Sequence, residues 1–274
     1  SSSGPLAWME LFSTMTHKVI QQGGSRRGAA MLILNDRHPD ILDFVDAKRT
    51  PGVLEGANVS VAISDDFMRA IRTDDSWDLV WQGELYKTLP AREIWQRIID
   101  SAWASGEPGV VFLERMNTSS NMRGIEELVA TNPCAEQPMG GYGTCLLGSV
   151  NILRHMRNGV LDEQMFQQTT RLAVRFLDNV IDRAYYPFPE CEESEKGLRR
   201  QGMGTIGLAD ALIVAGLKYG SDEAMAFTSR VFRLLNEATY GASIKLGEER
   251  GSFPLFYAEQ YGRGSFIQEL PAKL

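Results

Sequence analysis

Residues 132–138 read Asn-Pro-Cys-Ala-Glu-Gln-Pro, and after a glycine-rich link residues 145–151 read Cys-Leu-Leu-Gly-Ser-Val-Asn. An amide, a thiol and a carboxylate therefore alternate at Asn132, Cys134 and Glu136. The proline after Asn132 favours an extended conformation for that residue. Because alternate side chains of an extended segment point to the same side, we expect the three groups to face one ligand. The alternative is a surface loop that holds an ordinary buried cysteine.

The second cysteine of this region, Cys145, follows Cys134 after the flexible link. A disulfide, two ligands of a metal site and no relation at all remain open from the spacing. The sequence disfavours a zinc site, because structural zinc takes four ligands that include closely spaced Cys or His pairs. The three histidines are not spaced to complete such a set, so we expect no metal. Three cysteines also do not make a closed disulfide framework.

Composition limits the class of protein. The 274 residues include 28 Lys and Arg against 35 Asp and Glu, and 43% are hydrophobic, which excludes a disordered chain. A net charge of −7 argues against binding to a nucleic-acid polymer. No apolar run is long enough for a membrane span, and the first residues do not resemble a signal peptide. We therefore expect a globular cytoplasmic protein, cut from a longer chain because it lacks an initiator Met.

Short apolar runs alternate with amphipathic segments along the chain. Strands are predicted at 29–34, 58–63, 109–113 and 146–153, and helices at 5–22, 39–48, 90–105, 162–183, 208–215 and 221–249. A small exposed hairpin is predicted at 76–87, and the acidic run 190–195 is interpreted as a solvated loop. Strands separated by helices indicate an α/β fold with a mostly parallel sheet. Such sheets bind ligands at the carboxyl ends of their strands, where we expect the functional residues.

Two glycine-rich segments have separate interpretations. Gly23–Gly28 joins a helix to a strand, and its two arginines could bind a phosphate or a base. The alternative there is an ordinary helix-ending turn with solvated arginines. Gly202–Gly207 matches GxGxxG but follows a charged segment, so we do not predict a dinucleotide site. Tight packing of the following helix is the preferred explanation.

The stretches at 132–138 and 145–151 together resemble the active-site segment of the ribonucleotide reductase catalytic subunit. The Pro after Asn132, the Gln-Pro after Glu136 and the short spacing between the cysteines resemble the adenosylcobalamin-dependent, class II branch. The branch served by a separate radical-generating subunit usually has Leu in place of this proline. The resemblance spans essentially the whole chain, and it includes three further stretches in the family's order: Ser3-Gly4-Pro5 with its helix, Gly23 to Met31, and Arg199 to Leu212.

The resemblance implies an α/β fold that is part of the ten-stranded α/β barrel of ribonucleotide reductases, with additional helices. Residues 1–274 would be the central portion of one catalytic barrel domain, incomplete at both ends. It further implies that Cys134 carries a transient thiyl radical and abstracts the 3′-hydrogen of a ribose. Glu136 would take the 3′-OH proton, Asn132 would hydrogen-bond the ribose hydroxyls, and Cys145 would be one of two redox thiols.

The same resemblance implies the ligands and partners. Adenosylcobalamin would be the cofactor, and the substrate would be a ribonucleotide, expected as the diphosphate. The substrate-binding residues would be Ser2, Ser3, Asn132 and Glu136. A loop made of Gly24, Ser25, Arg26, Arg27 and Gly28 would respond to an ATP or dNTP effector. A thioredoxin-like dithiol would reduce the enzyme, a homodimer is expected, and no nucleic-acid polymer or membrane is.

Two departures from the family pattern define the alternatives. In the family the second redox thiol lies upstream of the Ser-Gly-Pro segment, and a phosphate-binding turn follows the region of Phe253. Neither feature is found in the 274 residues. The isolated chain is therefore expected not to turn over. A non-catalytic or split-enzyme fragment of the same barrel is one alternative, and another radical enzyme on the related glycyl-radical barrel is the other. The joint presence of Asn132, Cys134, Glu136 and Cys145 favours a reductase.

Overall fold

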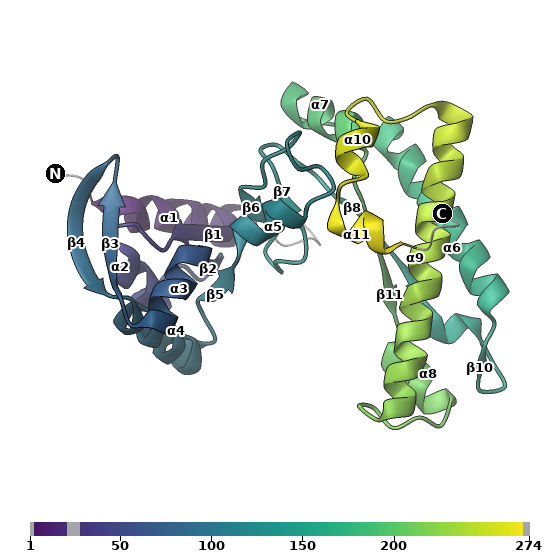
Figure 1. The fold of residues 1–274 in the computed structure, drawn as a ribbon, viewed down its shortest axis with the longest axis horizontal. Helices are drawn as coiled ribbons and strands as arrows, with labels where there is room; N and C mark the ends of the chain where they lie inside the picture. Colours follow the sequence, from purple (N-terminus) through teal and green to yellow (C-terminus); the bar gives the residue numbers. More distant parts are fainter. Residues whose placement is uncertain (1–2, 21–27, 271–274) are drawn as a thin grey trace. The chain divides into compact units, whose positions relative to one another are not determined.

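The computed structural model describes residues 3–20 and 28–270. Contacts within the chain define two compact units, drawn in Figure 1. The first unit comprises Ser1–Ser120 with Glu126–Gly141, and the second comprises Asn121–Ile125 with Tyr142–Leu274. Cys134 therefore belongs to the first unit and Cys145 to the second.

A three-stranded parallel sheet forms the centre of the first unit. Its order is β1 (Met31–Asn35), β2 (Asn58–Ala62) and β5 (Gly109–Val111), with Met31 opposite Asn58 and Ser60 opposite Gly109. These strands confirm the predicted apolar runs. The core around the sheet is made of buried aliphatic and aromatic side chains, among them Ile41, Phe44, Val45, Leu54, Val59, Val61, Phe67 and Ile94.

Three helices of the first unit pack against this core: α2 (Ile41–Asp46), extended by the 3-10 turn η3 (Ala47–Arg49), α3 (Asp65–Thr73) and α4 (Ala91–Ser105). Helix α3 begins where the Ser64 hydroxyl accepts a hydrogen bond from the Phe67 amide. Helix α4 ends at Gly106, which has a φ of 81° that glycine adopts without strain. A further short helix, α5 (Leu113–Ser119), was not predicted.

The predicted hairpin exists as β3 (Ser76–Trp81) and β4 (Glu84–Pro90), but it is not fully exposed. Trp77 is only 5% exposed, and its ring meets that of Phe67 edge to face at 5.2 Å between centroids. Because strand side chains alternate between two faces, one face of this hairpin joins the core.

The N-terminal helix is α1 (Gly4–Thr14), followed by the π-helical turn η1 (Met15–Ile20). Its apolar side chains at helical spacing, Trp8, Phe12, Met15 and Val19, are exposed within the described residues. Leu6 and Met9 of α1 pack against the core instead, and polar groups add further contacts. Glu10 accepts a hydrogen bond from the Leu54 amide at 2.9 Å, and Ser13 accepts one from the Gly56 amide at 3.0 Å.

The second unit is built on a pair of parallel strands, β8 (Leu146–Asn151) and β11 (Gln201–Ile206). Helices α6 (Glu163–Arg183) and α9 (Asp222–Arg250) pack against each other, and α6 also packs on β8 (Figure 1). Helix α8 (Leu208–Val214) follows β11. The remaining elements are η4 (Ile152–His155), β9 (Met156–Arg157), β10 (Val160–Leu161), α10 (Ala258–Tyr261) and α11 (Ser265–Glu269).

One interpretation of the second unit is wrong. The acidic run at 190–195 is part of helix α7 (Pro189–Leu198), and Glu195 is 1% exposed. Most of the GxGxxG segment forms a strand that was not predicted, β11 (Gln201–Ile206). Its last glycine, Gly207, precedes α8, and a Cβ there would lie 2.8 Å from Asn151 and 3.6 Å from Leu153. Helix α8 contacts η4, as the preferred explanation of close helix packing expects. Across the part of the chain that the structure describes, no helix combines the length and apolar character needed to cross a bilayer.

Candidate active site

The stretch at 132–138 forms the loop of a hairpin between β6 (Ala130–Thr131) and β7 (Pro138–Met139). The Ala135 amide donates to the Asn132 carbonyl at 2.9 Å, which closes a β-turn. The Gln137 amide donates to Oδ1 of Asn132 at 3.0 Å, and the Asn132 amide donates to the Gln137 carbonyl at 3.2 Å. The predicted extended conformation is therefore wrong, because these local hydrogen bonds fold the segment back on itself.

The turn leaves the Cys134 and Glu136 side chains exposed. Cys134 is an exposed free thiol at the third position of the turn, and Ala135 after it has a φ of 65°. Glu136 is exposed and Asn132 is half-buried. The amide, thiol and carboxylate predicted to act together thus belong to one six-residue loop, although strand alternation is not what places them there.

The loop lies at the amino ends of the parallel strands of the first unit. Asn58, the first residue of β2, donates from Nδ2 to the Pro133 carbonyl at 3.0 Å, and β6 contacts β1. The candidate residues of this loop therefore do not lie at the carboxyl ends of the sheet, where they were expected. Gly28 to Ala30 lead into β1 at the same amino end, and the Ala30 carbonyl accepts from the Asn58 amide at 2.8 Å.

The residues predicted to bind substrate and effector are only partly described. Ser3 is exposed and immediately precedes α1, whereas Ser2 lies outside the described residues. Gly28 is half-buried just before β1. The rest of the predicted effector loop, Gly24, Ser25, Arg26 and Arg27, also lies outside the described residues.

In the second unit, Cys145 is half-buried, forms no disulfide and directly precedes β8. A Cβ atom built on Gly202 of β11 would lie 3.1 Å from Cys145 Sγ and 2.3 Å from Leu147 Cδ2. Cys145 and Leu147 thus share the face of the sheet on which Gly202 leaves room. Gly148, on the opposite face, would place a Cβ 3.1 Å from Leu177 of α6. The candidate redox thiol consequently lies on the face of the β8–β11 pair that points away from α6.

A buried carboxyl group anchors the residue before this thiol. Thr144 donates its hydroxyl to Oε2 of Glu195, and Oε1 of Glu195 has no hydrogen-bond partner among the described residues. Burial raises the pKa of Glu195, and the Thr144 hydrogen bond and the nearby Arg200 and Arg199 only partly oppose it. Sequence reasoning missed Glu195 because it lies in a run of acids typical of a solvated surface.

An ion-pair network fixes the start of β11 to the helices. Arg199, with a φ of 48°, ends α7 and donates from Nε to Asp178 of α6 at 2.8 Å. Arg250 of α9 reaches the other oxygen of Asp178 at 2.5 Å, and Arg199 also pairs with Asp182. The hydrogen bond from Arg199 lowers the pKa of Asp182. The side chain of Asp178 is only 9% exposed, whereas those of Arg250 and Asp182 are 37% and 51% exposed, so only the centre of the network is shielded from water.

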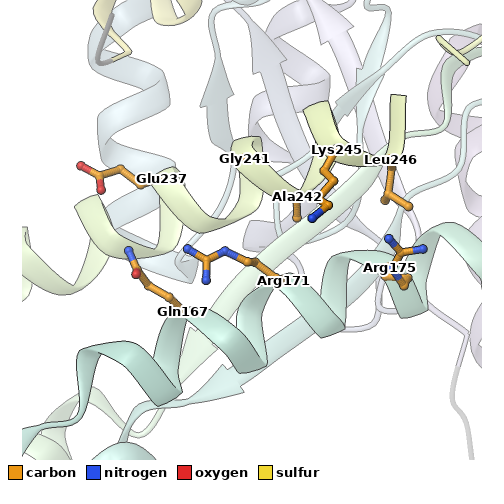
Figure 2. A pocket seen from close by; sticks show the side chains of 8 residues that line it. All are labelled: Gln167, Arg171, Arg175, Glu237, Gly241, Ala242, Lys245 and Leu246. Atoms are coloured by element: carbon orange, nitrogen blue, oxygen red, sulfur yellow. The ribbon is translucent and has the colours of Figure 1, made fainter. Parts of the chain in front are cut away.

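A cavity of about 560 Å³ lies between α6 and α9 (Figure 2). Figure 2 shows Arg171 and Lys245 in the space between the two helices, and Arg175 pairs with Glu249 nearby at 2.6 Å. None of the predicted catalytic residues lines this cavity. Residues 3–20 and 28–270 hold no group of three or more His, Cys, Asp or Glu side chains arranged to bind a metal ion.

Comparison with known proteins places this geometry in a family. The sequence model described as "Ribonucleotide reductase, barrel domain" matches residues 1–273. The chain is 40% identical over 266 residues to the vitamin B12-dependent ribonucleoside-diphosphate reductase of Mycobacterium tuberculosis, a match that covers 96% of this chain and 38% of that protein. It is 39% identical over 264 residues to the protein of the same name from Thermoplasma acidophilum, covering 95% of this chain and 34% of the relative.

A more distant match is the ribonucleoside-diphosphate reductase subunit alpha of Chlamydia pneumoniae, which is 28% identical over 89% of this chain and 27% of that protein. The chain thus spans between a quarter and two fifths of the length of these relatives. The match to the family model confirms the resemblance and the α/β barrel class inferred from residues 132–151. This chain belongs to the ribonucleotide reductase family and carries sequence of its barrel domain.

Proposed function

We propose that this chain is the central part of the catalytic barrel of a vitamin B12-dependent ribonucleoside-diphosphate reductase, which converts ribonucleotides to 2′-deoxyribonucleotides for DNA synthesis. The names of the relatives that match almost the whole chain support the proposal. The observation that carries it is the exposed free thiol of Cys134 on a loop that also bears Asn132 and Glu136. Both compact units would belong to one barrel domain.

Adenosylcobalamin, when bound, supplies the radical that removes a hydrogen atom from a thiol. Cys134 fits this requirement, because its sulfur is exposed and not committed to a disulfide. The turn holds the sulfur on the outer side of a hydrogen-bonded loop, where it can be reached without unfolding the hairpin. Among the described residues, Cys134 is the group that would meet the cofactor's radical.

The residues beside Cys134 suit the two hydroxyl groups of a ribose. Once it has lost its hydrogen, the Cys134 sulfur takes the 3′-hydrogen of the ribose. Glu136, an exposed carboxylate, accepts the proton of the 3′-hydroxyl as a general base. The carbonyl oxygen of the Asn132 amide already accepts from Gln137, so its NH₂ group is directed to donate to a ribose hydroxyl oxygen.

The reduction itself needs two electrons, which two thiols supply. As the 2′-hydroxyl leaves as water, Cys145 and a second cysteine, expected upstream of Ser3, form a disulfide. Cys134 then returns the 3′-hydrogen to the sugar. The sum is one ribonucleotide and two thiols converted to one deoxyribonucleotide, one disulfide and one water. The hydrogen bond from Thr144 to Glu195 would hold Cys145 in place, and a thioredoxin-like dithiol would reduce the disulfide.

The same proposal covers the ligands around the site. The substrate would be a ribonucleoside diphosphate bound beside Ser2 and Ser3, and the exposed position of Ser3 before α1 is compatible with that role. Gly24 to Gly28 would respond to an ATP or dNTP effector. The protein would work in the cytoplasm, and a homodimer is proposed.

The test uses the full-length protein with adenosylcobalamin, a dithiol and CDP, and measures deoxynucleotide by chromatography. We expect turnover in the wild type, none in Cys134→Ser, and near wild-type turnover in Cys191→Ser, the matched control in α7. The serine O–H bond is too strong to take part in the hydrogen transfer. Retained nucleotide reduction in Cys134→Ser would overturn the proposal. Replacing CDP by CTP tests the diphosphate assignment.

A further inference from the structure

Asn58 joins two segments that lie far apart in the sequence. Its backbone amide donates to the Ala30 carbonyl at 2.8 Å, at the end of the segment that enters β1. Its side-chain Nδ2 donates to the Pro133 carbonyl at 3.0 Å, in the loop that bears Cys134. One residue therefore contacts both Ala30 and the thiol loop.

The Pro133 carbonyl belongs to the peptide unit that leads directly into Cys134. Because a peptide unit is planar and rigid, fixing this oxygen limits rotation of the backbone on the amino side of Cys134. The hydrogen bonds among Asn132, Ala135 and Gln137 close the loop on itself. The bond from Asn58 instead attaches the loop to the sheet.

Asn58 itself is held firmly from both sides. Lys48 donates to the Ala57 carbonyl and also pairs with Glu107. Oε1 of Glu107 accepts a hydrogen bond from the Val59 amide at 2.9 Å. Val59 is buried in the core of the unit. The residues before and after Asn58 are thus fixed by one ion pair, which gives its side chain a rigid base.

We propose that Asn58 is a positioning residue that sets the orientation of the Cys134 thiol and attaches its loop to the start of β2, beside Ala30. The catalytic part of this inference rests on the proposed function, whereas the attachment of the loop does not. A misplacement of about 1 Å at a reacting group costs roughly 100-fold in rate. We therefore expect loss of this hydrogen bond to lower kcat by about 10- to 100-fold and to leave the KM for nucleotide nearly unchanged.

The experiment compares three variants of the full-length protein. Asn58→Ala removes the donor, and Asn58→Asp keeps the shape but places a carboxylate oxygen against the Pro133 carbonyl. Asn35→Ala is the matched control. Asn35 is the exposed last residue of β1, at the carboxyl end of the same sheet. Its side chain accepts a hydrogen bond from the Arg37 amide at 2.9 Å.

Two readouts need neither cofactor nor activity: amide hydrogen exchange across residues 132–137, and the rate of Cys134 alkylation measured on its own peptide. A hydrogen bond worth about 1 kcal/mol predicts roughly fivefold faster exchange of the Ala135 and Gln137 amides in both Asn58 variants. Cys134 alkylation should change as well. Asn35→Ala should behave as the wild type, and exchange in the interior of β2 should be unchanged in all three variants.

The outcomes separate the inference from the function on which it rests. Wild-type exchange, alkylation and kcat in both Asn58 variants would overturn the positioning role and leave the reductase assignment intact. A raised KM with unchanged kcat would overturn it too, because Asn58 would then act on substrate binding. If the wild type reduces no nucleotide, the proposed function fails, and faster loop exchange in the Asn58 variants would still support the attachment of the loop.

Discussion

Replacing Gly202 by alanine adds one methyl group beside the candidate redox thiol. Its Cβ would lie 2.3 Å from Cδ2 of Leu147, where carbon atoms normally approach to about 3.5–4.0 Å. The Leu147 methyl must therefore move by roughly 1.2–1.7 Å. Leu147 is 62% exposed, so its side chain can rotate into solvent. The Cys145 sulfur, at 3.1 Å from the new Cβ, has to move only by a few tenths of an ångström.

Gly204→Ala is the matched control two residues along the same strand. Its Cβ would meet Oγ of Ser149 at 3.5 Å and the Gly148 carbonyl oxygen at 3.9 Å, which are ordinary contacts. Alanine in a strand gains about 0.5–1 kcal/mol over glycine at either position. Overpacking costs about 1–3 kcal/mol, and the exposure of Leu147 puts Gly202→Ala toward the lower end. We therefore expect Gly202→Ala to be less stable than Gly204→Ala by about 1–2 kcal/mol.

Amide hydrogen exchange in β8 of the full-length protein measures this difference locally. A change of 1–2 kcal/mol predicts roughly 5- to 30-fold faster exchange of the protected β8 amides in Gly202→Ala than in Gly204→Ala. Alkylation of Cys145 should be slower in Gly202→Ala, because the added methyl covers the sulfur. Equal exchange and equal Cys145 alkylation in the two variants would refute the close contact between β11 and the thiol.

Two further predictions concern buried charge in the second unit. Burial raises the pKa of Glu195, so the folded protein keeps this proton at pH values where the unfolded chain releases it, and wild-type stability should fall as pH rises above the ordinary value of 4.5. Glu195→Gln has no proton to release there, so its stability should not show the part of this fall that Glu195 causes. Denaturation over a pH series should therefore show the stability of Glu195→Gln relative to wild type increasing with pH. A decrease would contradict the raised pKa of Glu195. Asp178→Ala leaves Arg199 and Arg250 without their shared carboxylate, and we expect a loss of about 3 kcal/mol in chemical denaturation. A loss below about 1 kcal/mol would show that water compensates the two arginines.

The sequence predicted the residues of the thiol loop but not its conformation. The extended interpretation relied on Pro133 and on alternating polar residues. Asn followed by Pro is also a common start of a β-turn, because proline has the backbone angle that the second turn position needs. In the structure the Asn132 side chain accepts from Gln137 and stabilises the turn. A hydrogen bond between residues five apart leaves no periodic signal in the sequence.

Periodicity worked best where a segment is long and packs on one side, as in α4, α6 and α9. It failed at β11, where a glycine-rich strand lacks the apolar alternation that identifies strands. It also failed at α7, because the burial of Glu195 depends on Thr144, 51 residues earlier. The contact from Asn58 to Pro133 spans 75 residues and could be found only from the fold.

The glycines of β11 also affect the register in which β11 pairs with β8 during folding. Met203 stands opposite Gly148 and packs into the apolar interior of the second unit, while Gly202 stands opposite Leu147. Slippage of β11 by one residue would turn the Met203 side chain out of the apolar interior toward solvent. A larger side chain would then replace Gly202 beside the Cys145 sulfur. The pairing of Gly202 with Leu147 thereby fixes the position of Cys145 along the strand pair.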